Sequence, residues 1–359
     1  MKVGFVSTWD TLCGFAVYIR PLVLEFKKLG VEVKAFSEKD LPFVPRIKVP
    51  REIPYSKRWS RYDHSFKELE EAILEYSPDV AYFVHGTALF GLDSRLKTLV
   101  GNLSRSGIKV AMDLEVPLPE FVDYFNSLDV DAYLLVVTDL DLPLKNKYYI
   151  PFPAIPMNLV GKKIARKKLG IPLNSWMCLV TGFVGQQSGV EYLVRSFRLV
   201  ANEIPDSRLY IVGGVHPWDR KYWLERGIRL ARDLDLLDKN VFFTKRVASE
   251  TELALYGSAT DLFLNYRKDY PWKIFGGAIM RAVSCRKPVV AYDCYSIRNV
   301  PRGIVKISTE EEMARSIVQL YKDRDLYLKL KREMEDLYEE RKYSRVARMI
   351  LKILEELVG

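Results

Sequence analysis

Cysteine, histidine and glutamine are scarce in this sequence. Among its 359 residues there are four cysteines, three histidines and three glutamines. No two cysteines show C-x-x-C spacing and no histidine pattern accompanies them, which argues against a zinc site. Four thiols in a chain of this length fit a reducing compartment, so we expect a cytoplasmic protein. The low glutamine content, beside abundant Lys, Arg, Glu and Tyr, resembles the composition of thermophile proteins.

Long hydrophobic runs and a dinucleotide-binding fingerprint are also absent. No stretch approaches 18 consecutive apolar residues, so we expect no transmembrane segment. The opening run at residues 1–6 is too short for the core of a signal peptide, and a buried first strand explains it better. No G-x-G-x-x-G motif and no metal-ligand cluster occur. We therefore expect no metal and no cofactor.

The net charge of +9 is concentrated in the second part of the chain. Residues 1–150 contain 19 Lys and Arg against 21 Asp and Glu, a net charge of −2. The remaining residues contain 36 basic against 25 acidic side chains, a net charge of +11. The second part is therefore the expected place for an anionic ligand.

Short apolar runs alternate with amphipathic helical stretches along the first 150 residues. The runs are rich in valine, as in strands of a parallel sheet that is covered on both faces. We predict strands at 3–7, 31–36, 80–84, 109–112 and 132–137, and helices at 16–29, 66–76 and 92–106. The alternation indicates a doubly wound α/β domain.

A second α/β series follows an uncharged junction with three prolines at 150–158. We predict strands at 177–181, 208–212, 241–244, 262–265 and 289–292, and helices at 189–203, 220–236, 250–256, 276–285 and 310–322. The tail at 326–357 is expected to be helical, with a break near 342–344. Two such domains bind ligands where the strands end and the helices begin.

The segment Pro42–Lys67 departs from this regular pattern. It holds seven Lys or Arg residues interleaved with Tyr55, Trp59 and Tyr62, and it is expected to be a long, partly ordered loop. Basic and aromatic residues together could contact a phosphate-bearing acceptor, a nucleic acid or the surface of a membrane. We prefer the alternative of a connection whose aromatic rings pack onto the domain, and a nucleic-acid partner is not expected.

Three glycine-containing turns lie between a strand and a helix. They contain Gly14 in the first domain, Gly182–Gly189 at the head of the second, and 272–277 late in the second. Glycine lets the backbone approach a ligand closely, and the N–H groups of such turns can bind an anion.

These turns and their flanking strands resemble the GT-B glycosyltransferases of family 4, which are retaining enzymes that use nucleotide-sugar donors. The resemblance covers nearly the whole chain and is clearest over 259–264 and 275–291. It implies two Rossmann-like, doubly wound domains that face a central cleft. Residues 1–150 would form the acceptor side and 151–340 the donor side, and the helix at 341–359 would cross back onto the first domain.

The polar residues that carry the family's chemistry are substituted. The family has two glutamates spaced E-x7-E across the third turn, one facing the donor sugar and the other the nucleotide ribose; Lys273 and Arg281 occupy these positions. Ser188 stands where a lysine usually holds the pyrophosphate, and Phe183 where an arginine often follows the first glycine. Lys273 and Arg281 could restore the lost positive charge from another direction.

A structural explanation of the two cations is equally open. Lys273 would then be a solvated turn residue, and Arg281 would pair with a carboxylate such as Asp261 or Asp293. The residues expected to bind the donor or its phosphates are Gly14, Gly185, Ser188, Gly189, Lys273, Phe275, Gly276, Gly277 and Arg281.

Two residues of the first domain are candidate catalytic groups. His85 follows an apolar strand and is expected at the cleft edge, as a base, a sugar contact or a structural histidine bonded to a loop carbonyl. Asp113 is expected at the end of the next strand, where it would orient the acceptor, act as a base or cap a turn.

These expectations lead to two functions of different classes. The first is a glycosyltransferase that transfers a hexose from a nucleotide-sugar, or binds a related phosphate-bearing ligand, with an acceptor that the sequence does not identify. The second is a catalytically degenerate relative that acts as a binding or scaffold protein. Whether the protein is an enzyme is left open at this point.

Overall fold

The computed structural model describes residues 1–42, 44–115, 118–136, 142–215, 221–267, 277–294, 297–298 and 300–359. The chain divides into two compact units. Unit 1 contains Met1–Pro153 and Arg341–Gly359, and unit 2 contains Ala154–Glu340. Each unit is a parallel sheet with helices on both faces, so the α/β prediction of two Rossmann-like domains is confirmed.

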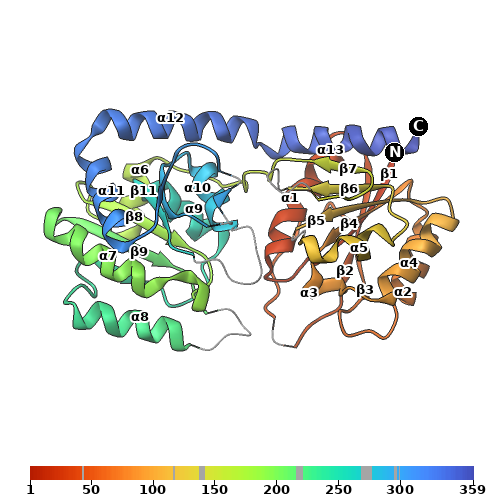
Figure 1. The fold of residues 1–359 in the computed structure, drawn as a ribbon, viewed down its shortest axis with the longest axis horizontal. Helices are drawn as coiled ribbons and strands as arrows, with labels where there is room; N and C mark the ends of the chain where they lie inside the picture. The colour runs from red at the N-terminus through yellow and green to blue at the C-terminus, as the bar shows by residue number, and fades with distance from the viewer. Residues whose placement is uncertain are drawn as a thin grey trace. The chain divides into compact units, whose positions relative to one another are not determined.

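The sheet of unit 1 has seven strands in the order β3-β2-β1-β4-β5-β6-β7 within the described residues (Figure 1). Its elements are β1 Lys2–Val6, α1 Gly14–Lys28, β2 Glu32–Glu38, β3 Tyr55–Trp59, α2 Lys67–Tyr76, β4 Val80–His85, α3 Thr87–Phe90, α4 Ser94–Arg105, β5 Lys109–Leu114, the 3-10 helix Pro119–Phe121, α5 Val122–Asn126, β6 Ala132–Leu135, β7 Lys147–Tyr149 and α13 Tyr343–Val358.

The two faces of this sheet are covered by different helices. Alternate residues of β4 and β5, such as Phe83 and Met112, belong to an apolar core with α2, α4 and α5. The opposite face carries Phe5 and Tyr82 and is covered by α1 and α13, which pack against each other. Side chains two residues apart on a strand share a face, so this face also receives Asp113.

The sheet of unit 2 has six strands in the order β10-β9-β8-β11-β12-β13 within the described residues. Its elements are α6 Lys162–Leu169, β8 Trp176–Thr181, the 3-10 helix Gln186–Ser188, α7 Val190–Glu203, β9 Ser207–Val212, α8 Tyr222–Asp233, β10 Val241–Phe243, α9 Glu250–Ala259, β11 Leu262–Asn265, α10 Gly277–Cys285, β12 Val289–Tyr292, β13 Ile304–Ile307, α11 Glu310–Lys322 and α12 Arg324–Glu340. Helices α7, α8 and α11 share one core with the sheet.

Local capping determines where several of these helices begin. The Ser249 hydroxyl accepts a hydrogen bond from the N–H of Glu252, whose carboxylate accepts one from the N–H of Ser249. This reciprocal pair starts α9, and Thr309 and Asp93 cap α11 and α4 with their side chains. Among the described helices, none is long and apolar enough to cross a membrane.

Pro42–Lys67, with Phe43 outside the described residues, contains the edge strand β3, so the prediction of a partly ordered loop was wrong here. Trp59 is fully buried, its Nε1 donates to the Phe36 carbonyl at 3.1 Å, and its ring stacks on Phe90. Arg61 makes two hydrogen bonds, of 2.8 and 2.7 Å, to the buried carboxylate of Glu38. Part of the basic and aromatic pattern therefore serves the fold.

A buried arginine joins α6 to the sheet of unit 2. The Arg166 side chain is 1% exposed, and its guanidinium donates to Asp261 Oδ2 at 2.7 Å and to backbone carbonyls that include Ala259 and Ser175. Asp261 Oδ2 also accepts the N–H of Met177 in β8. The carboxylate named as a partner of Arg281 is therefore held by α6 instead.

We expect Arg166→Met to lower the free energy of unfolding of unit 2 by about 3–5 kcal/mol, because it leaves the buried Asp261 carboxylate without its main partner. Lys163→Met, on the exposed face of the same helix, is the matched control and should change it by less than about 0.5 kcal/mol. Urea unfolding followed by tryptophan fluorescence measures both variants, and equal losses would contradict this role.

Candidate functional site

The glycine-rich turn after β8 is tied to the ends of the neighbouring strands. The N–H of Gly182 donates to the Val212 carbonyl at 3.3 Å, and the N–H of Val184 donates to the Gly214 carbonyl at 2.9 Å. A Cβ added at Gly213 would lie 1.8 Å from the Gly182 carbonyl oxygen. The backbones of the two strand ends are thus in contact, which holds the turn at the carboxyl edge of the sheet.

Gly189 ends this turn and begins α7. It has φ +57°, and a Cβ there would lie 2.0 Å from the carbonyl oxygen of Tyr266, just beyond β11. Only glycine fits this approach, which fixes where α7 starts relative to β11. The N–H groups of the first turn of a helix have no intrahelical partner and carry a partial positive charge. The start of α7 therefore lies beside Tyr266 at the carboxyl edge of the sheet.

Ser188 shapes the turn with its hydroxyl. The Ser188 Oγ donates to the Gly185 carbonyl at 2.6 Å and accepts the N–H of Gly185 at 3.2 Å. The side chain expected to bind phosphate is thus hydrogen-bonded within its own 3-10 turn. The expected role of Ser188 in binding a phosphate stays a prediction.

Arg281 lies in α10 and pairs with a carboxylate, but not with either of the two we named. Its two terminal nitrogens lie 2.7 and 3.0 Å from the two oxygens of Glu250 at the start of α9. Asp261 is held by Arg166, and Asp293 lies 3.6 Å from Lys306. Glu250 neutralises much of the charge that Arg281 would offer to a phosphate.

Most of the other residues expected to bind the donor at the turn 272–277 lie outside the described residues. Lys273, Phe275 and Gly276 belong to that part of the chain, whereas Gly277 is the first residue of α10. Their expected roles stay predictions.

Arg267 is a cation at the turn that sequence reasoning missed. It follows β11 by two residues, and its Nη2 donates to Gln187 Oε1 in the glycine turn at 2.6 Å. The sequence signal was present: Arg267 stands directly after the apolar run that ends at β11, in the position where strand-end side chains reach a ligand. Arg267 thus places a positive charge beside Gln187, and its guanidinium is itself engaged in this contact.

His85 is buried rather than placed at an open edge. It is the last residue of β4, is 2% exposed, and lies against the rings of Phe90 and Phe125. Its Nε2 is 3.3 Å from the Gly91 carbonyl oxygen. Burial lowers the pKa of His85 from 6.5 to about 4, so the ring is neutral at pH 7. This is the environment of a structural histidine.

Asp113 lies inside β5 and beneath α1, so our expectation that the strand ends before it was wrong. Its side chain is fully buried, and its Oδ2 accepts hydrogen bonds from the hydroxyls of Tyr18, at 2.5 Å, and Tyr82, at 2.9 Å. Burial raises the pKa of Asp113 to about 6. Glu115 follows at the strand end, and its pKa is raised by burial and by the charge of Asp113.

Gly14 begins α1 in a backbone conformation that any residue can adopt. A Cβ added there would meet nothing within 4 Å. The fold of unit 1 does not require glycine at this position, and the expected approach of a ligand stays a prediction.

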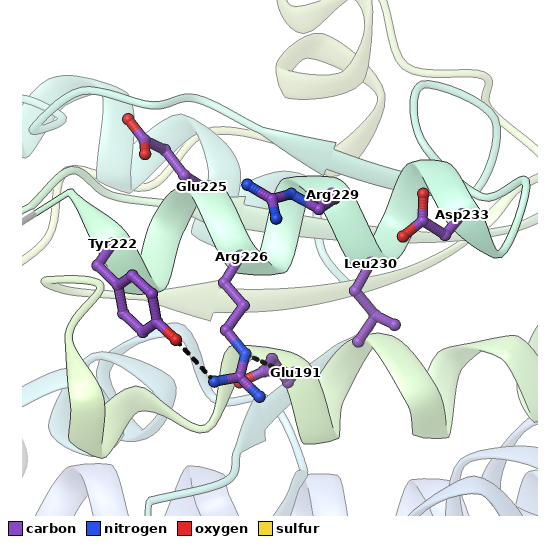
Figure 2. A pocket seen from close by; sticks show the side chains of 7 residues that line it. All are labelled: Glu191, Tyr222, Glu225, Arg226, Arg229, Leu230 and Asp233. Carbon is purple, nitrogen blue, oxygen red and sulfur yellow. Dashed lines mark hydrogen bonds and ion pairs between the residues drawn. The ribbon is translucent and has the colours of Figure 1, made fainter.

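A groove of about 360 Å³ lies between α7 and α8 (Figure 2). Arg226 crosses it and binds Glu191 Oε1 at 2.7 Å and the Tyr222 hydroxyl at 2.9 Å. None of the expected site residues lines it, and one of its two arginines, Arg226, is already paired. Among the described residues, no three Asp, Glu, His or Cys side chains gather to hold a metal ion.

The two units differ in charge. Unit 1 carries 24 basic and 23 acidic residues, a net charge of +1, and unit 2 carries 31 and 23, a net charge of +8. The excess of positive charge lies in the unit that holds the glycine-rich turn, which favours an anionic ligand there.

Comparison with known proteins agrees with this arrangement. Residues 177–323, which include the glycine-rich turn and α10, match the family model of Glycosyl transferases group 1. No curated protein matches the sequence significantly.

Solved structures of GT-B glycosyltransferases share the fold over the whole chain. A glycosyltransferase from Rickettsia africae ESF-5 is 15% identical with a TM-score of 0.77, covering 100% of this chain and 98% of that one. Sucrose-phosphate synthase from Thermosynechococcus elongatus is 16% identical with a TM-score of 0.74, covering 99% of both chains. Anabaena HepE, solved in complex with UDP and glucose, is 14% identical with a TM-score of 0.70, covering 99% of this chain and 100% of that one.

The fold is therefore that of the GT-B glycosyltransferases, and residues 177–323 carry the sequence pattern of glycosyltransferase group 1. The resemblance to GT-B glycosyltransferases is confirmed, and the substitution of the family's catalytic residues stays a prediction.

We expect Gly189→Ala to destabilise the turn by about 1–3 kcal/mol, because the new methyl group meets the Tyr266 carbonyl. Gly161→Ala, before α6 in the same unit, meets only the Ile164 side chain at 3.8 Å and is the matched control. Urea unfolding compares the two variants. Equal stability would show that Gly189 is not required for the approach to Tyr266.

We expect the stabilising contribution of His85 to be present above pH 6.5 and to be lost as pH falls towards 4. In this range the histidine of the unfolded chain binds a proton, whereas the buried ring of the folded chain stays neutral. The shift corresponds to about 3 kcal/mol. The difference in unfolding free energy between the wild type and His85→Gln, measured from pH 7 to pH 4, should shrink by this amount. A constant difference would show that the pKa of His85 is the same in the folded and the unfolded chain.

Proposed function

We propose that this protein is a glycosyltransferase that transfers a hexose from a nucleotide-sugar donor, with retention of the anomeric configuration. One observation carries the proposal. At the start of α7, Gly189 of the turn Gly182–Gly189 lies against the backbone of Tyr266, and both residues belong to the segment that matches the glycosyltransferase family model. HepE, which has the same fold, was solved with UDP and glucose, and a donor of this chemical class suits the charge of unit 2.

The donor diphosphate would be bound mainly by backbone groups and by one arginine. The first N–H groups of α7 offer hydrogen bonds and a partial positive charge. Arg267 adds a full charge beside Gln187. The residues that we propose to bind the donor still include Gly185, Gly189 and Gly277. Lys273, Phe275 and Gly276, which lie outside the described residues, are also kept. Ser188 and Arg281 would support the site through their contacts with Gly185 and Glu250.

The reaction breaks the bond between the sugar C1 and the diphosphate oxygen and forms a bond from C1 to a hydroxyl oxygen of the acceptor. The hydroxyl proton passes to the departing nucleoside diphosphate. The transition state gains negative charge on the leaving phosphate, which is where the N–H groups of α7 and Arg267 would act. We assign the acceptor to unit 1, near Gly14 and Asp113, and we assign no proton transfer to His85.

A catalytically degenerate binding protein is the second candidate. Two observations favour it: the Ser188 hydroxyl is hydrogen-bonded within its own turn, and Arg281 is paired with Glu250. Such a protein would bind the nucleotide-sugar without transferring its sugar.

We propose the cytoplasm as the compartment of this activity. None of the four cysteines forms a disulfide in the structure, and three of them, Cys178, Cys285 and Cys294, are buried. Unpaired thiols of this kind fit a reducing environment.

Titration calorimetry with UDP-glucose, GDP-mannose and UDP tests the donor site. We expect at least one of these ligands to bind. Arg267→Ala should weaken its binding by about 10-fold or more, since hydrogen bonds to a charged group contribute about 1.5–3 kcal/mol. Arg267→Lys should retain part of the affinity. Arg229→Ala, in the groove between α7 and α8, is the control and should bind as the wild type does.

The same titrations separate the two candidates. Release of the nucleoside diphosphate in the presence of an acceptor supports the enzyme, and binding without turnover supports the degenerate protein. Failure of every nucleotide-sugar to bind would refute both.

A further inference from the structure

Helix α6 of unit 2 has one face turned to solvent and the other fixed to the fold. In an α-helix, residues three and four apart share a face. The opposite, buried face includes Ala165 and Arg166. The exposed face consists of Lys163, Ile164, Lys167 and Lys168. Three lysines therefore surround one isoleucine on a face that packs against nothing in the core.

Large aliphatic side chains in and beside α6 are unusually exposed. Ile164 and Leu173 are each 56% exposed, the highest value of any large aliphatic side chain among the described residues. Val160, just before the helix, is 38% exposed. A Cβ added at Gly161 would lie 3.8 Å from Ile164 Cδ1, so Ile164 lies beside the residue that follows Val160. Single exposed apolar residues are ordinary, but three of them within 160–173 form a local group.

The backbone that carries Val160 and Leu173 is held by hydrogen bonds. The N–H of Val160 donates to Ser258 Oγ in α9 at 3.0 Å. Arg166 Nη1 donates to the carbonyls of Leu173, at 2.6 Å, and Ser175, at 2.9 Å. The buried guanidinium thus holds the turn after α6 from below, and the fold itself keeps these apolar side chains at the surface.

No carboxylate accompanies the three lysines in the sequence, because residues 142–190 contain no Asp or Glu. Among the described residues, Lys163, Lys167 and Lys168 form no ion pair. Lys163 and Lys167 are like charges one helical turn apart, which disfavours the helix. The helix dipole explains cations in the last turn of α6, but it gives no reason for Lys163 or Ile164.

The carboxylates of the elements that pack against α6 are already paired. Asp261, just before β11, contacts Lys162 and Arg166. The two glutamates of α9, which packs against α6, each pair with an arginine. Within the described part of the chain, the three lysines of α6 therefore find no partner of opposite charge.

An anionic membrane surface matches both properties of α6. Lysine ammonium groups are attracted to anionic headgroups, and aliphatic side chains enter the boundary between headgroups and acyl chains. A nucleic acid would attract the lysines but would leave Ile164 and Leu173 in water. The segment Pro42–Lys67 suits a membrane less well, because its cations Arg46 and Lys57 contact carboxylates of unit 1.

We propose that α6 and its flanks bind the surface of a membrane that contains anionic phospholipids. This α6 surface consists of Val160, Lys163, Ile164, Lys167, Lys168 and Leu173. Arg166 contacts Ser175 and Asp261, which stand just before β8 and β11, so α6 lies at the amino edge of the sheet. The glycine-rich turn follows β8 at the opposite edge. The α6 surface is therefore separate from the proposed donor site and does not depend on glycosyl transfer.

Cosedimentation of the full chain with vesicles tests the charge of the α6 surface. The vesicles contain phosphatidylcholine with or without phosphatidylglycerol. We expect binding only when phosphatidylglycerol is present, and weaker binding as salt is raised. Lys167→Gln should weaken binding about 5-fold, and Lys163→Gln/Lys167→Gln about 25-fold. Lys97→Gln, at an exposed position of α4, is the matched control and should bind as the wild type does.

The apolar part of the surface is tested separately. Ile164→Ser should weaken binding to vesicles that contain phosphatidylglycerol about 5-fold, because the isoleucine no longer leaves water. Leu199→Ser, at a 41% exposed position of α7, is the matched control and should leave binding unchanged. Urea unfolding of all variants checks that each is folded.

The outcomes separate this inference from its alternatives. No cosedimentation with either vesicle, or equal binding to both, would overturn the membrane surface. Unchanged binding of Ile164→Ser would also overturn it, and lysine-dependent binding of a DNA oligonucleotide in that case would assign the surface to nucleic acid. The vesicles are tested without a nucleotide-sugar, so failure of every donor in calorimetry would refute the proposed function and leave this inference standing.

Discussion

The covering of both faces of each parallel sheet is the constraint on which the rest of the structure depends. The central strands β1, β4 and β5 of unit 1, and β8 and β11 of unit 2, have to be apolar on both sides. Polar side chains then gather mainly where the strands end, and the buried Asp113 within β5 is an exception that two tyrosine hydroxyls accommodate. The glycine-rich turn, Arg267 and Glu115 all lie at such ends, so the architecture itself limits where chemistry can take place.

The same constraint explains which strands the sequence could predict. The predicted strands all exist, because continuous apolar runs mark strands that are buried on both faces. The strands that were missed, β3, β7 and β13, are edge strands in their sheets, are half exposed, and read as mixed polar segments. Helix α6 was missed because five of its eight residues are Lys or Arg and its buried face depends on Arg166.

The site was predicted less well than the fold, for an equally physical reason. We expected His85 and Asp113 at the cleft edge, and both are buried. For His85 the structure agrees with the alternative of a structural histidine bonded to a loop carbonyl, here that of Gly91, six residues along the chain. Tyr18 and Tyr82, the partners of Asp113, come from distant parts of the chain, and periodicity cannot reveal them. The glycines of the glycine-rich turn were predictable because a close approach between backbones requires glycine, which is visible in the sequence. The pairing of Arg281 with Glu250 has no such signal in the sequence.

The return of the chain to unit 1 has a consequence for its biosynthesis. Helix α13 packs on α1, and the Tyr343 hydroxyl donates to the carbonyl of Tyr18, the residue whose own hydroxyl binds Asp113. Unit 1 therefore consists of two segments separated by all of unit 2. On the ribosome, the contacts that support Asp113 cannot be completed until α13 has emerged, so unit 2 is synthesised in full before unit 1 can be finished.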